Sequence, residues 1–116
     1  MNLTVWHHTG CGSSRNAVAY LQSKGIEPTL YMYLKEKPDA AKILTVLERL
    51  GLEAAELLRP NEDVGIKLGI YDKGVSQEKI LAAMVENPIL IQRPIVITDK
   101  RAVIARPKTE IDRILE

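Results

Sequence analysis

The sequence predicts an α/β fold, and three observations lead to that prediction. Residues 3–6 and 29–34 alternate in the manner of strands and are rich in strand-forming side chains. A segment with helical spacing joins them, as a pair of parallel strands requires. Near the other end, residues 95–98 and 102–105 are apolar runs around a short polar turn, which is typical of an antiparallel pair.

The first of these groups forms a βαβ unit. Ala17, Val18 and Leu21 share one face of a helix that the spacing predicts over 16–24. Gly25 can take the left-handed conformation that ends a helix. The second strand, 29–34, is therefore expected to lie parallel to the first through a right-handed crossover.

Residues 38–87 are predicted to be helical. The start signals are Pro38-Asp39 for the first helix, 61–63 for a weak turn to residue 68, and Ser76 for a helix to about residue 87. A shorter helical piece is expected over 53–58, and Gly51 and Pro88 act as stop signals. The positions expected to face inward are Ile43, Val46, Leu47, Leu50, Ile80, Leu81, Met84 and Val85.

The last third completes the topology. The strand over 95–98 is expected to be buried on both faces, and Thr109 is expected to cap a final short helix through Leu115. The order β-α-β, helices, β-β-α is that of a thioredoxin-like fold with a helical insertion in the middle. At 116 residues, we expect one domain over 1–116.

Composition excludes several classes of function. Sixteen basic and fifteen acidic residues leave no basic field for nucleic acid. No segment approaches the length of a membrane span, and the first residues do not resemble a secretory signal. A single cysteine cannot form an internal disulfide, which favours the reducing cytoplasm.

That cysteine, Cys11, is expected in the loop between the first strand and the first helix. The free N–H groups of a helix start favour a thiolate and any oxyanion that the thiolate attacks. His7 and Arg15 are the nearby groups that could help to lower its pKa. Because glycines flank Cys11, we interpret it as a reactive thiol rather than a buried apolar side chain.

Three arginines, Arg59, Arg93 and Arg106, each precede a proline at the edge of a predicted element. Proline restricts the preceding backbone to extended conformations, and a guanidinium offers a planar fork that matches a tetrahedral oxyanion. Solvated surface charge and anion binding are about equally good interpretations of this set of three.

Other sites are excluded by spacing. Ala17 stands where a tyrosine phosphatase cradle would place arginine, and Ser14 stands where a Cys-x-x-Cys pair would place its second cysteine. His7 and His8 point to opposite faces of a strand end, so they do not form a joint metal site. No metal site is expected.

Several motifs together resemble the glutaredoxin-coupled, glutathione-dependent arsenate reductase family in its short form. The motifs are Cys11-Gly12-Ser13-Ser14-Arg15-Asn16, Gly25 to Pro28, Leu57-Leu58-Arg59, Pro88 to Val96, and Arg106-Pro107. The likeness runs nearly from end to end of the chain.

The resemblance implies a role for each of these residues in arsenic detoxification. Cys11 would attack arsenate, and glutathione and then glutaredoxin would supply the reducing thiols, with no bound cofactor. The oxyanion would be held by Arg59, Arg93 and Arg106. Supporting roles would fall to His7 near the nucleophile, Ser14 and Arg15 in the loop, and Pro94 as a cis proline facing the site.

Two alternatives use the same fold. One is a redox-responsive regulator of the Spx type that binds RNA polymerase, although Ser14 interrupts the two-cysteine switch of such proteins. The other is a thiol-dependent reductase with a different substrate.

Overall fold

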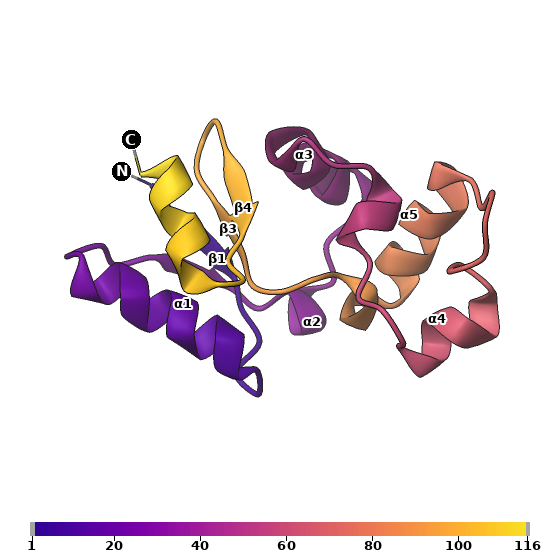
Figure 1. Ribbon diagram of the computed structural model, residues 1–116, viewed down its shortest axis with the longest axis horizontal. Helices are drawn as coiled ribbons and strands as arrows, with labels where there is room; N and C mark the ends of the chain where they lie inside the picture. The colour runs from indigo at the N-terminus through magenta and orange to yellow at the C-terminus, as the bar shows by residue number, and fades with distance from the viewer. Residues whose placement is uncertain (1, 116) are drawn as a thin grey trace. The chain divides into compact units, whose positions relative to one another are not determined.

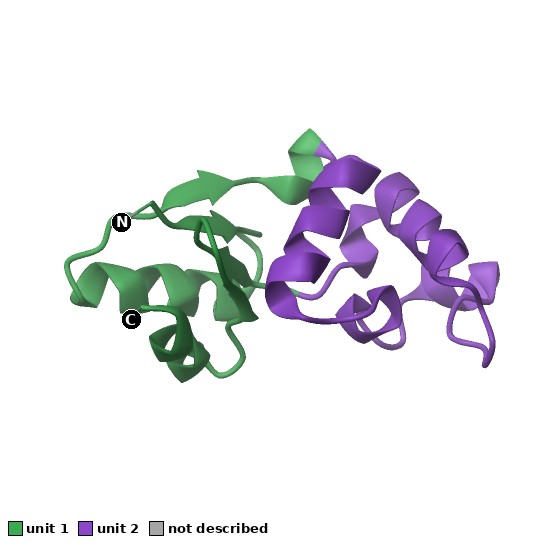
Figure 2. Ribbon diagram, turned by 90° about the horizontal axis from the view of Figure 1, so that it is seen from above, with its two compact units in different colours: residues 1–36, 93–116 green, residues 37–92 purple. Residues whose placement is uncertain are grey.

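The computed structural model describes residues 2–115, and the chain divides into two compact units (Figure 2). Unit 1 comprises Met1–Glu36 and Arg93–Glu116, and unit 2 comprises Lys37–Gln92. The predicted helical insertion therefore forms a unit of its own. In the sequence it separates the two segments that build the sheet. The single domain over 1–116 stays a prediction.

The sheet of unit 1 has four strands in the order β2-β1-β3-β4 (Figure 1). The strands are β1 (Thr4–Trp6), β2 (Thr29–Tyr31), β3 (Ile95–Ile97) and β4 (Ala102–Ile104). β1 pairs in parallel with β2 and antiparallel with β3, and β3 pairs antiparallel with β4. The strand arrangement confirms the predicted β-α-β and β-β-α halves of an α/β fold.

Two helices cover one face of this sheet, α1 (Gly12–Ser23) and the 3₁₀ helix η3 (Lys108–Ile114). Val5, Val96 and Val103 are register partners across three strands, so their side chains share the face toward these helices. The buried cluster consists of Leu3, Val5, Ala17, Leu21, Val96, Val103, Ala105, Ile111 and Ile114. This core packs α1 and η3 against β1, β3 and β4.

The element bounds in unit 1 differ from prediction at three places. α1 begins at Gly12, four residues earlier than predicted, because the Arg15 N–H already donates to the Cys11 carbonyl (3.1 Å). β2 ends at Tyr31, and the short helix α2 (Tyr33–Glu36) follows.

The third difference concerns the C-terminal helix. Pro107 occupies the cap position of η3, so the prediction that Thr109 caps it is wrong. The Glu110 N–H donates to the Pro107 carbonyl (3.0 Å), a bond that starts the helix two residues earlier than a Thr109 cap would.

Unit 2 consists of helices and turns. They are α3 (Ala40–Leu50), the 3₁₀ helix η1 (Ala54–Leu57), α4 (Asp63–Leu68), α5 (Gln77–Glu86) and the 3₁₀ helix η2 (Pro88–Leu90). Asp39 caps α3 by accepting from the Lys42 N–H (2.8 Å), and Ser76 caps α5 by accepting from the Lys79 N–H (3.2 Å). Gly51 ends α3 with φ +71°, as predicted.

The inward face of α5 is rotated from the predicted one. Ile80, Ala83 and Met84 are buried, whereas Leu81 and Val85 are only half-buried. Leu50, at the end of α3, is likewise half-buried. Ala83 is small and only weakly hydrophobic, so the sequence pattern did not predict that it faces inward. It is buried because close packing of α5 favours a small side chain on the inward face. No helix among residues 2–115 combines the length and the apolar character that crossing a bilayer requires.

Candidate active site

Cys11 lies at the N-cap of α1, as the sequence predicts. Its backbone is extended (φ −104°, ψ 120°), and its N–H donates to the His8 carbonyl (3.0 Å). Its own carbonyl accepts the first helical hydrogen bond, from Arg15. The thiol is therefore held at the end of the helix where backbone N–H groups are free to bind an anion.

The surroundings of Cys11 favour its thiolate. The residue is only 8% exposed, and this burial raises the pKa of the thiol. Hydrogen bonds from the Ser14 N–H, the Arg93 side chain, the Ser14 hydroxyl and the Ser13 N–H act in the opposite direction and outweigh it. The net result is a pKa of about 7, so about half of the thiol is ionised at neutral pH.

Arg93 is the cation at the sulfur. Burial lowers the pKa of its guanidinium, but hydrogen bonds with Cys11 and Tyr33 outweigh this and raise the pKa. Its Nε and Nη1 are buried without a hydrogen-bond partner among residues 2–115. Two charged N–H donors next to a nucleophile provide a place for an oxyanion. The Arg93–Pro94 peptide bond is cis, as the resemblance implies.

Ser14 and Arg15 hold the loop that carries the thiol. Ser14 is fully buried at the first turn of α1. Arg15 reaches back over the loop, and its Nη1 donates to the Thr9 carbonyl (2.7 Å). The supporting roles of both residues stay predictions.

His7 lies at the end of β1 and is 6% exposed. Its N–H donates to the Tyr31 carbonyl (2.9 Å) and so extends the pairing of β1 with β2. Burial lowers the pKa of the imidazole, and the charge of Arg15 lowers it further, so both favour the neutral form of His7. Sequence proximity indicated His7 and Arg15 as the groups acting on Cys11, whereas Ser14, Arg93 and Ser13 are the groups that lower its pKa.

Arg106 joins the same site from the segment after β4. Its Nε donates to the Ser13 Oγ (3.1 Å), although the two residues are far apart in the sequence. Ser13 thus connects two parts of the site, since its N–H stabilises the Cys11 thiolate and its hydroxyl holds Arg106. Arg106 is exposed, and its peptide bond to Pro107 is also cis, which was not predicted.

Arg59, the third predicted arginine, belongs to unit 2. It lies between η1 and α4, where its N–H donates to the Leu90 carbonyl (2.8 Å). Its side chain makes one weak ion pair, Nε to Glu62 Oε1 at 3.9 Å. Nε and Nη1 are buried without a hydrogen bond among the described residues, which leaves this guanidinium with free donors as well.

Tyr71 was not predicted from the sequence as part of this arrangement. Its hydroxyl donates to the Arg59 carbonyl and accepts from the Glu62 N–H (3.2 Å). Gly65 makes room for it, because a Cβ at that position would lie 2.7 Å from the Tyr71 ring. A glycine inside a helix is unfavourable unless close packing needs it, so Gly65 within α4 is a sequence signal of this contact.

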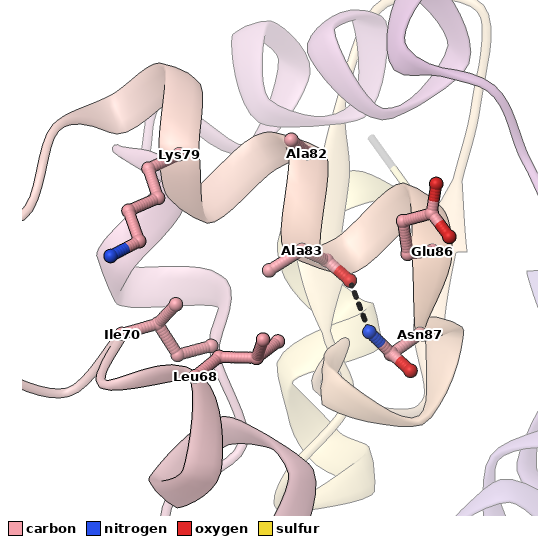
Figure 3. Close-up of a pocket in the computed structure, with 7 residues that line it drawn as sticks. All are labelled: Leu68, Ile70, Lys79, Ala82, Ala83, Glu86 and Asn87. Atoms are coloured by element: carbon pink, nitrogen blue, oxygen red, sulfur yellow. Dashed lines mark hydrogen bonds between the residues drawn. The ribbon is translucent and has the colours of Figure 1, made fainter.

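Two of the cavities among the described residues are notable, and Cys11 lines neither of them. One, in unit 1, is lined by Ser13, Asn16, Ala105, Arg106, Pro107 and Lys108. The other, in unit 2, is mostly apolar, with Leu68 and Ile70 opposite Ala83 and a hydrogen bond from Asn87 Nδ2 to the Ala83 carbonyl (Figure 3). Within residues 2–115, no group of three or more His, Cys, Asp or Glu side chains is placed to hold a metal ion.

Comparisons with known proteins agree on one family for this chain. Residues 6–114 match the model of the ArsC family. An arsenate reductase of Rhizobium meliloti is 36% identical over 99% of this chain and 82% of its own. The protein YfgD of Escherichia coli K12, which is named only as uncharacterized, is 37% identical over 96% of this chain and 94% of its own.

The solved structures agree with these sequence matches. The structure of an arsenate reductase from Vibrio cholerae superimposes with a TM-score of 0.95 and 33% identity, covering 99% of this chain and 98% of its own. At 99% of this chain, the match includes residues of both units.

Proposed function

Because the chain belongs to the ArsC family, we propose that it reduces arsenate to arsenite, with glutathione and glutaredoxin as the reductants. The thioredoxin-like fold that it shares with the family's arsenate reductases supplies the scaffold. Cys11 is the proposed nucleophile, and Arg93 is the proposed oxyanion ligand at the sulfur. The family resemblance adds Arg59 and Arg106 to the proposed oxyanion ligands. The reducing thiols that this chemistry needs make the cytoplasm the proposed compartment.

One observation carries this proposal: a thiol with a pKa of about 7 lies beside the half-buried Arg93, whose buried Nε and Nη1 have no hydrogen-bond partner among residues 2–115. A thiolate attacks an anion poorly unless positive charge reduces the repulsion between them. Arg93 supplies that charge at the sulfur, and its free donors can take two oxygens of a tetrahedral anion.

The reaction balances with two thiols. The Cys11 thiolate displaces one oxygen of arsenate, which leaves as water after protonation, and a sulfur–arsenic(V) bond forms. A glutathione thiol then provides the second sulfur. Arsenic(V) takes up two electrons and leaves as arsenite, while the two sulfurs lose them and form a disulfide between Cys11 and glutathione.

The cysteine count supports an external reductant. The chain contains one cysteine, so no second thiol of its own can resolve the intermediate. Glutathione fits this requirement as a small soluble thiol. Glutaredoxin would then reduce the Cys11–glutathione disulfide and restore the free thiol.

The decisive assay compares reductants on one substrate. Purified protein is supplied with arsenate and with either glutathione plus glutaredoxin or thioredoxin plus its reductase, and arsenite is measured directly. We expect turnover only with glutathione plus glutaredoxin, and none for Cys11→Ser. Turnover with thioredoxin alone would contradict the coupling, and no turnover with either system would favour a reductase with another substrate.

The regulator alternative is tested separately. A protein of the Spx type should retain RNA polymerase on an affinity column, whereas the enzyme proposed here should not. Nothing in the site requires such a partner, and Ser14 is fully buried where the switch would need a second reactive cysteine.

A further inference from the structure

A cationic pocket within unit 1 shares Ser13 with the surroundings of Cys11. It has a volume of about 270 Å³ and forms where the first turn of α1 meets the segment from β4 into η3. Its polar lining consists of Ser13, Asn16, Arg106 and Lys108, and no acidic side chain lines it. We call this cavity the thiol pocket.

The positive charge of this pocket is not neutralised by the protein. Arg106 uses its Nε on the Ser13 hydroxyl, a neutral acceptor. Lys108 places its Nζ 5.8 Å from the centre of the Tyr20 ring, a contact that positions the ammonium group and leaves its charge in place. Among residues 2–115, no carboxylate pairs with Arg106 or Lys108, and the nearby Asp112 pairs instead with Lys24 (3.4 Å).

The pocket is connected to the sulfur through Ser13, and it includes Arg106 but not Arg93. Arg93 hydrogen-bonds the Cys11 sulfur, whereas Arg106 bonds Ser13, two residues further along α1. A ligand in the thiol pocket would therefore lie beside a group bound to Cys11 and would leave the free donors of Arg93 for the substrate oxyanion.

We propose that the thiol pocket binds a carboxylate of the thiol co-substrate, so that the thiol is delivered to the sulfur or arsenic at Cys11. This inference rests on the proposed function, and it names the residues that would select the reductant. Glutathione carries a carboxylate on each side of its thiol and a net negative charge. A guanidinium, an ammonium and the amide of Asn16 around one pocket match a carboxylate by charge and by hydrogen-bond geometry.

The test uses thiol–disulfide exchange without arsenate, so that it does not depend on arsenate being the substrate. The Cys11 thiolate attacks glutathione disulfide, a bond forms between Cys11 and one glutathione, and the other glutathione leaves as its thiolate. The same exchange is run with uncharged hydroxyethyl disulfide. Intact-mass spectrometry gives both second-order rates, and their ratio reports recognition of the charged partner.

Lys108→Glu is the diagnostic variant, because Lys108 is exposed and does not contact the Cys11 sulfur in this structure. We expect it to lower the ratio of glutathione disulfide to hydroxyethyl disulfide rates about tenfold, the size of one lost charge-assisted interaction. Lys100→Glu, an identical charge change in the exposed turn between β3 and β4, is the matched control and should leave the ratio unchanged.

Equal ratios for the Lys108→Glu and Lys100→Glu variants would overturn the thiol pocket, since they would reflect net charge alone. A slower rate with both disulfides in Lys108→Glu would also overturn it, since that would indicate a change in Cys11 itself. If exchange behaves as expected but arsenate is not reduced, the proposed substrate is wrong and the thiol pocket stands.

Discussion

At the scale of single residues, the pKa of Cys11 depends on a few hydrogen bonds. Ser14, Arg93 and Ser13 together overcome the effect of burial and bring the pKa of the thiol to about 7. Neither His7 nor Arg15 is among the groups that lower the pKa of Cys11, although both are near it in the sequence. The positive charge at the sulfur comes from Arg93, which lies two residues before β3 and far from Cys11 in the sequence.

The first prediction concerns Arg93 and the titration of the thiol. Arg93→Ala removes a hydrogen bond and a positive charge that favour the ionised form, so the pKa of Cys11 should rise above 7. Iodoacetamide alkylation followed against pH measures it: the rate of the unaltered protein should be half-maximal near pH 7, and that of the variant at higher pH. Superimposable profiles would show that Arg93 does not act on the thiol.

The second prediction concerns anion affinity at the same residue. Arg93→Ala should weaken arsenate or sulfate binding by about 1.5–3 kcal/mol, the range for a hydrogen bond to a charged group. Lysine should restore only part of this, since a point charge cannot replace the planar fork. Calorimetric titration measures the affinity, and Arg113→Ala, which removes an exposed arginine paired with Glu110, is the control expected to have no effect.

At the scale of elements, capped helices were predictable and closely packed turns were not. Asp39, Gly51 and Ser76 marked the ends of α3 and α5 correctly, because caps are local hydrogen-bond requirements. The early start of α1 and the 3₁₀ form of η3 were missed. Both depend on how the chain packs against the sheet, which no local pattern encodes.

The same distinction applies to the site. Cys11 and the three arginines stood out by residue type and by their place before a helix or a proline. Their partners did not: Tyr33 at Arg93, Ser13 at Arg106 and Tyr71 at Arg59 are contacts between separate elements. Sequence therefore indicated the charged groups, and the structure was needed to find what holds them.

The third prediction tests the contact that holds Arg59 within unit 2. Gly65→Ala should destabilise the protein by about 1–3 kcal/mol, because the new Cβ would lie 2.7 Å from the Tyr71 ring. Urea denaturation gives the free energy of unfolding.

The matched control is a double-mutant cycle with Tyr71→Ala. Once the ring is absent, Gly65→Ala should cost much less than it does in the unaltered protein. Strictly additive effects of the two substitutions would contradict the close contact between Gly65 and Tyr71.

At the scale of the whole molecule, the residues of the proposed site are divided between the two units. The sheet unit contains the nucleophile, the arginine at the sulfur and the thiol pocket, and the helical unit contains Arg59 with its Tyr71 support. Since the chain has a single cysteine, the proposed reaction requires a second thiol from another molecule.

The most direct test of this account is the mass of the protein after one incomplete cycle. The protein is mixed with arsenate and glutathione, without glutaredoxin, then quenched with acid and analysed intact and after digestion. We predict one glutathione attached through a disulfide at Cys11 and one equivalent of arsenite released per adduct, with far less adduct when arsenate is omitted. An unmodified Cys11 accompanied by arsenite formation would contradict the account.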